Sequence, residues 1–285
     1  YPNLAVSSAS IWWWTMEPSH VAWVTAQFAG APLGDVRRTR RAVTLACQVV
    51  QRPGASLPQL AATPYAVKAT YTLFAHPAVT PARLQAPHRA QVHAAMHTPA
   101  PADPPVLLVE DTTVCSWSGQ APIPGLGPIA HGRDAAHGLQ GFLLHSVLAV
   151  RWAAAPPADT PTRPALTVLG LADQVAHVRT PAPAAEHAGP AGSRAHRRQG
   201  RWRESQLWRE TTARLGPAPE PATGVRWVRV CDREADIYEF LQECHAAGHG
   251  FVVRAAQDRR LAAAEARLWA TLTAAPAQTH GTLTL

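Results

Sequence analysis

The sequence has 285 residues, of which 47% are hydrophobic and 16% are charged, and its formal net charge is +7. This composition belongs to a globular protein and excludes an intrinsically disordered chain. No run of about 18 apolar residues and no signal peptide occurs, so we expect a cytoplasmic protein with no membrane partner. The four cysteines form no C-x-x-C pair, which argues against a disulfide framework or a zinc ribbon.

The positive charge is concentrated in residues 26–95. This segment holds eight basic residues and one acidic residue, Asp35, and eight minus one gives +7, the formal charge of the whole chain. A compact basic module beside a near-neutral one indicates that the first module binds a polyanion. The alternative is a basic surface without a polyanionic partner, and charge alone does not separate the two.

The N-terminal part divides into two segments. Residues 1–15 are expected to be an unstructured upstream extension, because the run Ile11–Trp14 has neither helical nor strand periodicity. Residues 16–95 are expected to form a helical DNA-binding domain. Asp35 should cap a helix that ends before Pro53, and further helices are expected at 57–60, at 64–74 and after Pro81.

A proline-rich linker is expected at 96–105, after which the hydrophobic period changes. The apolar run 106–109 predicts a buried strand, and further strands are expected at 141–150 and 165–175, the three forming a meander. An exposed loop at 180–203 and a helix at 204–215 should follow. A strand at 225–230, a helix at 233–247 and a strand at 251–254 complete a mixed α/β domain over 106–285.

Two aspartates, Asp111 and Asp232, are each predicted at the C-terminal tip of a buried strand, where ligands of open α/β sheets gather. Two carboxylates brought together there repel unless a hard cation such as Mg²⁺ or Mn²⁺ lies between them. The alternative, favoured by spacing alone, is that each aspartate caps the following turn. Cys244, His245 and His249 are weaker metal-ligand candidates, because Cys244 continues an apolar helical stripe.

Several motifs, in this order along the chain, resemble the insertion-sequence-four family of cut-and-paste DDE transposases. They are Leu33–Asp35 followed by Arg37–Arg41, Glu110–Thr113, Leu144–Leu148, Asp232–Ile237 and Phe251–Arg254. The resemblance covers roughly residues 20–285. It implies a ribonuclease-H-like catalytic core behind a small helical DNA-binding domain, with Asp111 and Asp232 as catalytic residues that bind two Mg²⁺ or Mn²⁺ ions.

The same resemblance implies an activity and a partner. Family members nick the transposon end hydrolytically, attack the other strand with the 3′ hydroxyl and later join the end to target DNA. The implied setting is the bacterial cytoplasm and nucleoid, with a homodimer in the synaptic complex. Arg37, Arg38, Arg41 and Lys68 are implied to contact end DNA, chiefly through phosphates, and Arg254 to face DNA near the active site.

The sequence departs from the family pattern at two places. The third catalytic residue of the family is a glutamate in a Tyr-Arg-x-x-x-Glu signature, which this sequence lacks; Glu265 is expected to be an exposed helix residue instead. Residues 282–285 resemble the opening of the family's inserted β region, so we expect an incomplete, inactive catalytic domain. Family members also often carry an arginine where this chain has Thr72.

Two other functions remain open at this point. The first is a DNA-binding remnant or an inhibitor of transposition that lacks catalysis. The second is a host nuclease of the same fold, against which the basic N-terminal module argues.

Overall fold

A computed structural model of the chain describes residues 19–61, 63–99, 105–119, 121–129, 139–152, 166–180, 202–261 and 266–276. The predicted extension 1–15, Glu265 and residues 282–285 lie outside these ranges, as does most of the predicted loop. The described residues form two compact units, one of residues up to Thr98 together with Val168–Val175, and one of the remainder. We call them the helical unit and the sheet unit. None of the described helices is long and apolar enough to cross a membrane.

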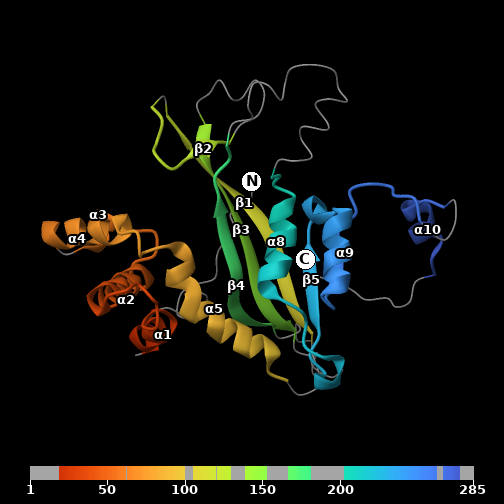
Figure 1. Cartoon of the computed structure of the whole chain (residues 1–285), viewed down its shortest axis with the longest axis horizontal. Helices are drawn as coiled ribbons and strands as arrows, with labels where there is room; N and C mark the ends of the chain where they lie inside the picture. The colour runs from red at the N-terminus through yellow and green to blue at the C-terminus, as the bar shows by residue number, and fades with distance from the viewer. Residues whose placement is uncertain are drawn as a thin grey trace, which may run out of the picture. The chain divides into compact units, whose positions relative to one another are not determined.

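The helical unit contains five described α-helices (Figure 1). They are α1 (Ser19–Phe28), α2 (Val36–Gln51), α3 (Leu57–Leu60), α4 (Pro64–Ala75) and α5 (Pro81–His97). Side chains cap the helix starts: Asp35 Oδ1 accepts the Arg37 N–H at 2.7 Å, and Thr63 and Thr80 cap α4 and α5. The predicted cap and helix positions are thus observed, although α5 reaches into the range predicted as linker. The core is formed by Ala31, Leu33, Ala42, Leu73 and Val79.

Part of strand β4 (Leu166–His177) also belongs to the helical unit. His88 of α5 joins three elements, because its Nε2 accepts the Leu171 N–H at 3.0 Å and its Nδ1 lies 2.6 Å from Gln27 Oε1 of α1. Burial lowers the pKa of His88, which favours the neutral ring that these two contacts require. Gly170 has a φ of +134°, and a Cβ there would lie 2.7 Å from His88, so only glycine fits.

A mixed sheet forms the centre of the sheet unit. Its strands are β1 (Val106–Ser118), β2 (Gly127–Pro128), β3 (Leu139–Trp152), β5 (Trp227–Cys231) and β6 (Gly250–Val253). They are ordered β2-β3-β1-β5-β6, and β4 is the sixth strand, off this path. β1 is antiparallel to β3, whereas β1, β5 and β6 are parallel to one another. The five predicted strands are all observed, with altered bounds.

Two predicted elements differ from the structure. The first strand extends to Ser118 instead of ending at residue 109, because β3 pairs with it over its whole length. The helix predicted at 233–247 is divided into the 3₁₀ turn η5 (Arg233–Ala235) and α9 (Tyr238–Ala246). The break lies at Asp236, whose carboxylate binds a distant backbone segment. The remaining described elements are α8 (Gln206–Leu215), η4 (Pro221–Thr223) and α10 (Leu268–Ala274).

Helices α8 and α9 lie side by side on one face of the sheet (Figure 1). Their core consists of Trp208, Cys231, Ala235, Phe240 and Cys244, all buried. The core position expected for Cys244 is therefore observed. Val109 and Val252, on the opposite face of the sheet, are 40% and 62% exposed. The face of the sheet that α8 and α9 cover is therefore the buried one, and we call it the packed face.

Candidate active site and DNA-binding surface

Three predicted site residues lie next to one another at one edge of the sheet, namely where the parallel strands β5 and β6 end. The register pairs Glu110 of β1 with Cys231 of β5, which in turn pairs with the last residue of β6. Asp111 is the next residue of β1, and Asp232 and Arg254 directly follow the last residues of β5 and β6. Neighbouring strands lie roughly 4.8 Å apart, so the three residues form a row. The Arg254 N–H donates to the Cys231 carbonyl at 3.3 Å, which keeps the chain beside β5 one residue beyond β6.

The two carboxylates of this row face the same side of the sheet. Successive side chains of a strand point to opposite faces, so Asp111 lies opposite the buried Glu110. Asp232 keeps an extended backbone with φ −79° and ψ −168°, so the alternation continues through it and places it opposite the buried Cys231. Both aspartates are exposed. Two adjacent carboxylates on one face repel, and a bound cation removes that repulsion.

The prediction that Asp111 lies at the tip of its strand is wrong. β1 continues past it to Ser118, because β3 supplies hydrogen-bond partners and pairs Asp111 with Ser146. Only the parallel pairing with β5 ends at Glu110. Asp232 does cap the following turn, since its Oδ1 accepts the Glu234 N–H at 2.8 Å. A carboxylate has about four lone-pair sites, so this cap leaves room for a metal ion.

The donor set at this edge fits a single hard cation. Carboxylate oxygens are the ligands that Mg²⁺ and Mn²⁺ prefer, and both aspartates are accessible. Within the described ranges, no group of three His, Cys, Asp or Glu side chains is arranged to hold a metal ion. Two aspartates can hold one ion, and a second ion needs ligands beyond this pair.

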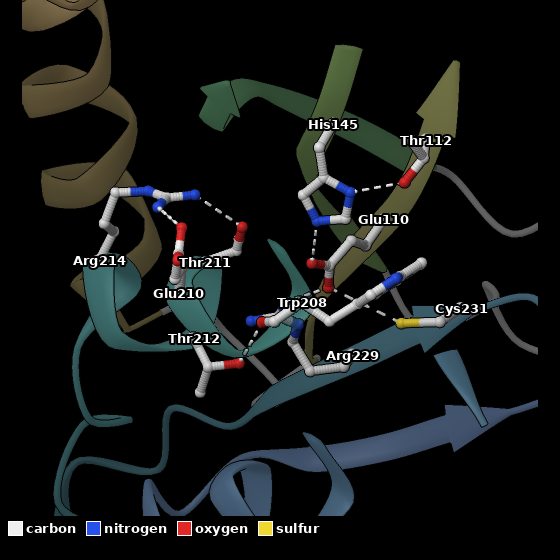
Figure 2. Close-up of polar contacts among 10 residues, drawn as sticks. All are labelled: Glu110, Thr112, His145, Trp208, Glu210, Thr211, Thr212, Arg214, Arg229 and Cys231. Atoms are coloured by element: carbon white, nitrogen blue, oxygen red, sulfur yellow. Dashed lines mark hydrogen bonds and ion pairs between the residues drawn. The ribbon is translucent and has the colours of Figure 1, made fainter. Parts of the chain in front are cut away.

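A buried polar network lies on the packed face, on the other side of the sheet from the two aspartates; Figure 2 shows its side chains. The Glu110 carboxylate accepts from His145 Nε2 at 2.8 Å and forms an ion pair with Arg229. The Cys231 thiol lies 3.8 Å from Glu110 Oε2. A neutral His145 satisfies both of its contacts, because its Nε2–H donates to Glu110 while its Nδ1 accepts the Thr112 hydroxyl at 2.7 Å. The Glu110 carboxylate of β1 thus contacts side chains from both flanking strands, His145 of β3 and Arg229 of β5.

The environment of this network is apolar and tightly closed. Arg229 is 0% exposed, and its guanidinium carbon lies 5.4 Å from the centroid of the Phe240 ring. Arg229 Nε and Nη1 have no hydrogen-bond partner within the described residues. Burial raises the pKa of the Cys231 thiol well above its usual range, so the sulfur stays protonated. Sequence reasoning missed this network, although an arginine at an inward position of an otherwise apolar strand signals a buried partner.

Asp236, in the motif that follows Asp232, has a structural role. Its Oδ2 accepts the N–H groups of Ala256 and Gln257 at 2.8 and 3.1 Å, and its Oδ1 accepts from Arg259. Burial alone would raise the pKa of Asp236, but these hydrogen bonds lower it. Asp236 therefore anchors the segment that follows Arg254.

The predicted DNA-binding arginines meet in a hollow of the helical unit. The hollow has a volume of about 270 Å³ and is lined by Asp35, Arg37, Arg38, Arg41, Ala69, Thr72, Leu73 and His76. Arg37 is partly neutralised by an ion pair with Asp35 at 3.0 Å, and hydrogen bonds from Arg37 lower the pKa of Asp35 to about 2. Lys68 is exposed one helical turn before Thr72, whose hydroxyl donates to its carbonyl at 2.9 Å. The surface thus combines α2 and α4.

His76 adds a side chain to this hollow that sequence reasoning missed. Its Nδ1 accepts the Ala78 N–H at 3.1 Å, and its Nε2 lies within hydrogen-bond distance of Arg38 Nη1. The Nε of Arg38 is buried and has no partner within the described residues. The fixed positive charge of the Arg38 guanidinium attracts an anion such as a phosphate oxygen.

Comparison with known proteins bears on this surface. Residues 20–79 match the family model described as transposase DNA-binding. The matched range begins within α1 and ends after α4, so it contains the whole hollow. The match supports a transposase-family role for the chain, with DNA as its partner.

Proposed function

We propose that the chain is of the DDE transposase type, of the insertion-sequence-four kind that acts in bacterial DNA transposition, and that its 285 residues by themselves bind DNA without nicking it. The helical unit binds duplex DNA at transposon ends, and the sheet unit is a ribonuclease-H-like core. The strand arrangement supports this core, since the antiparallel β1–β3 pair is followed by parallel β5 and β6. The observation that carries the proposal is the row of Asp111, Asp232 and Arg254 in a chain whose N-terminal part matches a transposase DNA-binding model.

The residues of the row have complementary roles. Asp111 and Asp232 would hold Mg²⁺ or Mn²⁺, and Asp232 is oriented by its hydrogen bond to the Glu234 N–H. When bound, a divalent ion activates a water and stabilises the leaving 3′ oxygen. Arg254 is exposed beside Asp232 and supplies the cation for a nearby phosphate. Target capture, strand transfer and a synaptic homodimer belong to the same proposal.

The helical unit would hold the DNA backbone through Arg38, Arg41 and Lys68, with Arg37 on the rim of the hollow. Such contacts neutralise phosphates and release condensed counterions, so they fix position without reading sequence. A second function, a DNA-binding inhibitor of transposition without catalysis, is favoured by one observation. Among the described residues, no third His, Cys, Asp or Glu joins the two aspartates in an arrangement that could hold a metal ion.

Fluorescence anisotropy with a labelled DNA duplex at increasing salt tests the DNA-binding part. We expect the logarithm of affinity to fall linearly with the logarithm of salt concentration, by about 0.9 for each neutralised phosphate. Salt-independent binding, or none, would contradict the proposal. Nicking of a supercoiled plasmid in Mg²⁺, compared with Asp232→Asn, separates the two functions: nicking that the variant loses identifies a complete enzyme.

A further inference from the structure

We propose that the buried pair Glu110–Arg229, with His145, is a positioning device that holds Asp111 and Asp232 opposite each other. This inference rests on the proposed function, because it concerns the same two carboxylates. The pair is buried on the packed face, whereas the aspartates lie one residue further along each strand on the opposite face. Glu110, Arg229 and His145 are therefore positioning residues and touch no substrate.

The pair lies at the level where the parallel pairing of β1 and β5 ends. Glu110 belongs to the last pair of the parallel register between β1 and β5, and Asp111 and Asp232 follow that pair directly. Beyond it β5 ends, and backbone hydrogen bonds no longer fix the spacing of the two chains. The side-chain contacts of Glu110 to Arg229 and to His145 tie β1 to both of its neighbours at this level (Figure 2).

The buried pair also favours one register between β1 and β5 over its neighbours. A slip of one residue between neighbouring strands moves every side chain to the other face. If β1 slipped against β5, Asp111 would turn inward and Glu110 would leave Arg229 without a partner. A buried charge without its partner is strongly disfavoured, so the pair adds to the register preference that burial of one face of the sheet already gives. The ion pair therefore selects the register that presents both aspartates outward together.

Stability alone does not explain why the network is present. Its surroundings are apolar, with the Phe240 ring over Arg229 and the Trp208 ring centroid 4.8 Å from that of His145. Buried ion pairs contribute little net stability compared with apolar residues of similar volume. Arg229 even leaves two nitrogens without a partner among the described residues. A role in specifying geometry accounts for this arrangement better than a role in stability.

The test replaces the network by apolar residues in Glu110→Met/His145→Leu/Arg229→Met. We expect a folded protein with a melting temperature near that of the unmodified chain, but with Mn²⁺ affinity lowered about 10–100-fold, as for other residues that orient metal ligands. Mn²⁺ alone is the probe, with binding followed by electron paramagnetic resonance. Arg209→Met/Glu243→Met removes an ion pair of the same unit that links α8 to α9, and should leave Mn²⁺ affinity unchanged.

One conservative variant, Arg229→Lys, and one metal-independent measurement separate positioning from folding. Arg229→Lys preserves the cation beside Glu110 and should retain Mn²⁺ affinity even if the apolar variant unfolds. Hydrogen exchange of the backbone around Asp111 and Asp232 should accelerate in the folded apolar variant, and this readout needs no metal. Unchanged Mn²⁺ affinity and exchange in that variant, or equal loss in Arg229→Lys, would overturn the inference. Failure of Asp232→Asn to weaken Mn²⁺ binding would instead overturn the proposed metal site.

Discussion

Replacing Arg229 alone by methionine should destabilise the sheet unit strongly. Glu110 and Arg229 are 2% and 0% exposed, so the variant leaves a buried carboxylate with only His145 beside it. Removing one partner of a buried pair costs about 3–5 kcal/mol. For comparison, Arg209→Met breaks a pair whose side chains are 42% and 33% exposed, and such exposed pairs contribute about 0.2–1 kcal/mol.

Urea unfolding followed by tryptophan fluorescence measures this difference, because Trp208 and Trp227 are both buried in the sheet unit. With a slope of about 2 kcal/mol per molar urea, a loss of 4 kcal/mol moves the midpoint by about 2 M. The apolar triple variant should recover most of that loss, because no unpaired charge remains. A midpoint for Arg229→Met no lower than that for Arg209→Met would refute the reasoning.

Further predictions concern DNA binding, acid sensitivity and catalysis. Arg38→Gln and Arg41→Gln should each flatten the salt dependence of DNA binding by about 0.9 per lost phosphate contact. Arg40→Gln removes the same charge from α2, but at a position that does not line the hollow, and should change the salt dependence less. Thr72→Arg should steepen the dependence by a similar amount, and an unchanged slope would exclude Thr72 from the DNA surface. Asp236→Asn should cost about 1–3 kcal/mol at neutral pH in thermal or urea unfolding. Because the folded pKa of Asp236 is lowered, its contribution is present above the unfolded pKa of 3.8 and is lost as pH falls through the folded value. A difference in the free energy of unfolding between Asp236→Asn and the unmodified chain that persisted in strong acid would contradict this pH dependence. The 285-residue chain should bind plasmid DNA without nicking it in Mg²⁺, since two aspartates hold one ion; nicking abolished by the Asp232→Asn change would show a third ligand.

Signals within short stretches of sequence were sufficient to predict where the helices of the helical unit begin. Asp35 caps α2 as expected, because an N-cap depends only on residues within one helical turn. The proline positions that open α4 and α5 are equally local. The convergence of Arg38 and His76 is different, since the two side chains come from separate helices whose packing no short motif records.

Long-range pairing explains what the sequence did not reveal in the sheet unit. The polar run that begins at Glu110 looks like the end of a strand, yet β3 extends β1 through it. Glu110 and Arg229 are 119 positions apart, and only the register brings them together. The same register aligns Asp111 with Asp232. The carboxylates could therefore be found from motifs, whereas the partner of the buried Arg229 could not.

Iron-directed cleavage of the protein backbone tests the central claim most directly. Fe²⁺ substitutes for Mg²⁺ at oxygen-rich sites and, with ascorbate and peroxide, cuts the chain close to where it is bound. We predict cuts near both Asp111 and Asp232 that excess Mg²⁺ suppresses and that either aspartate-to-asparagine change abolishes at both positions. Cleavage near only one aspartate, or at both in the variants, would contradict a shared metal site at this edge of the sheet.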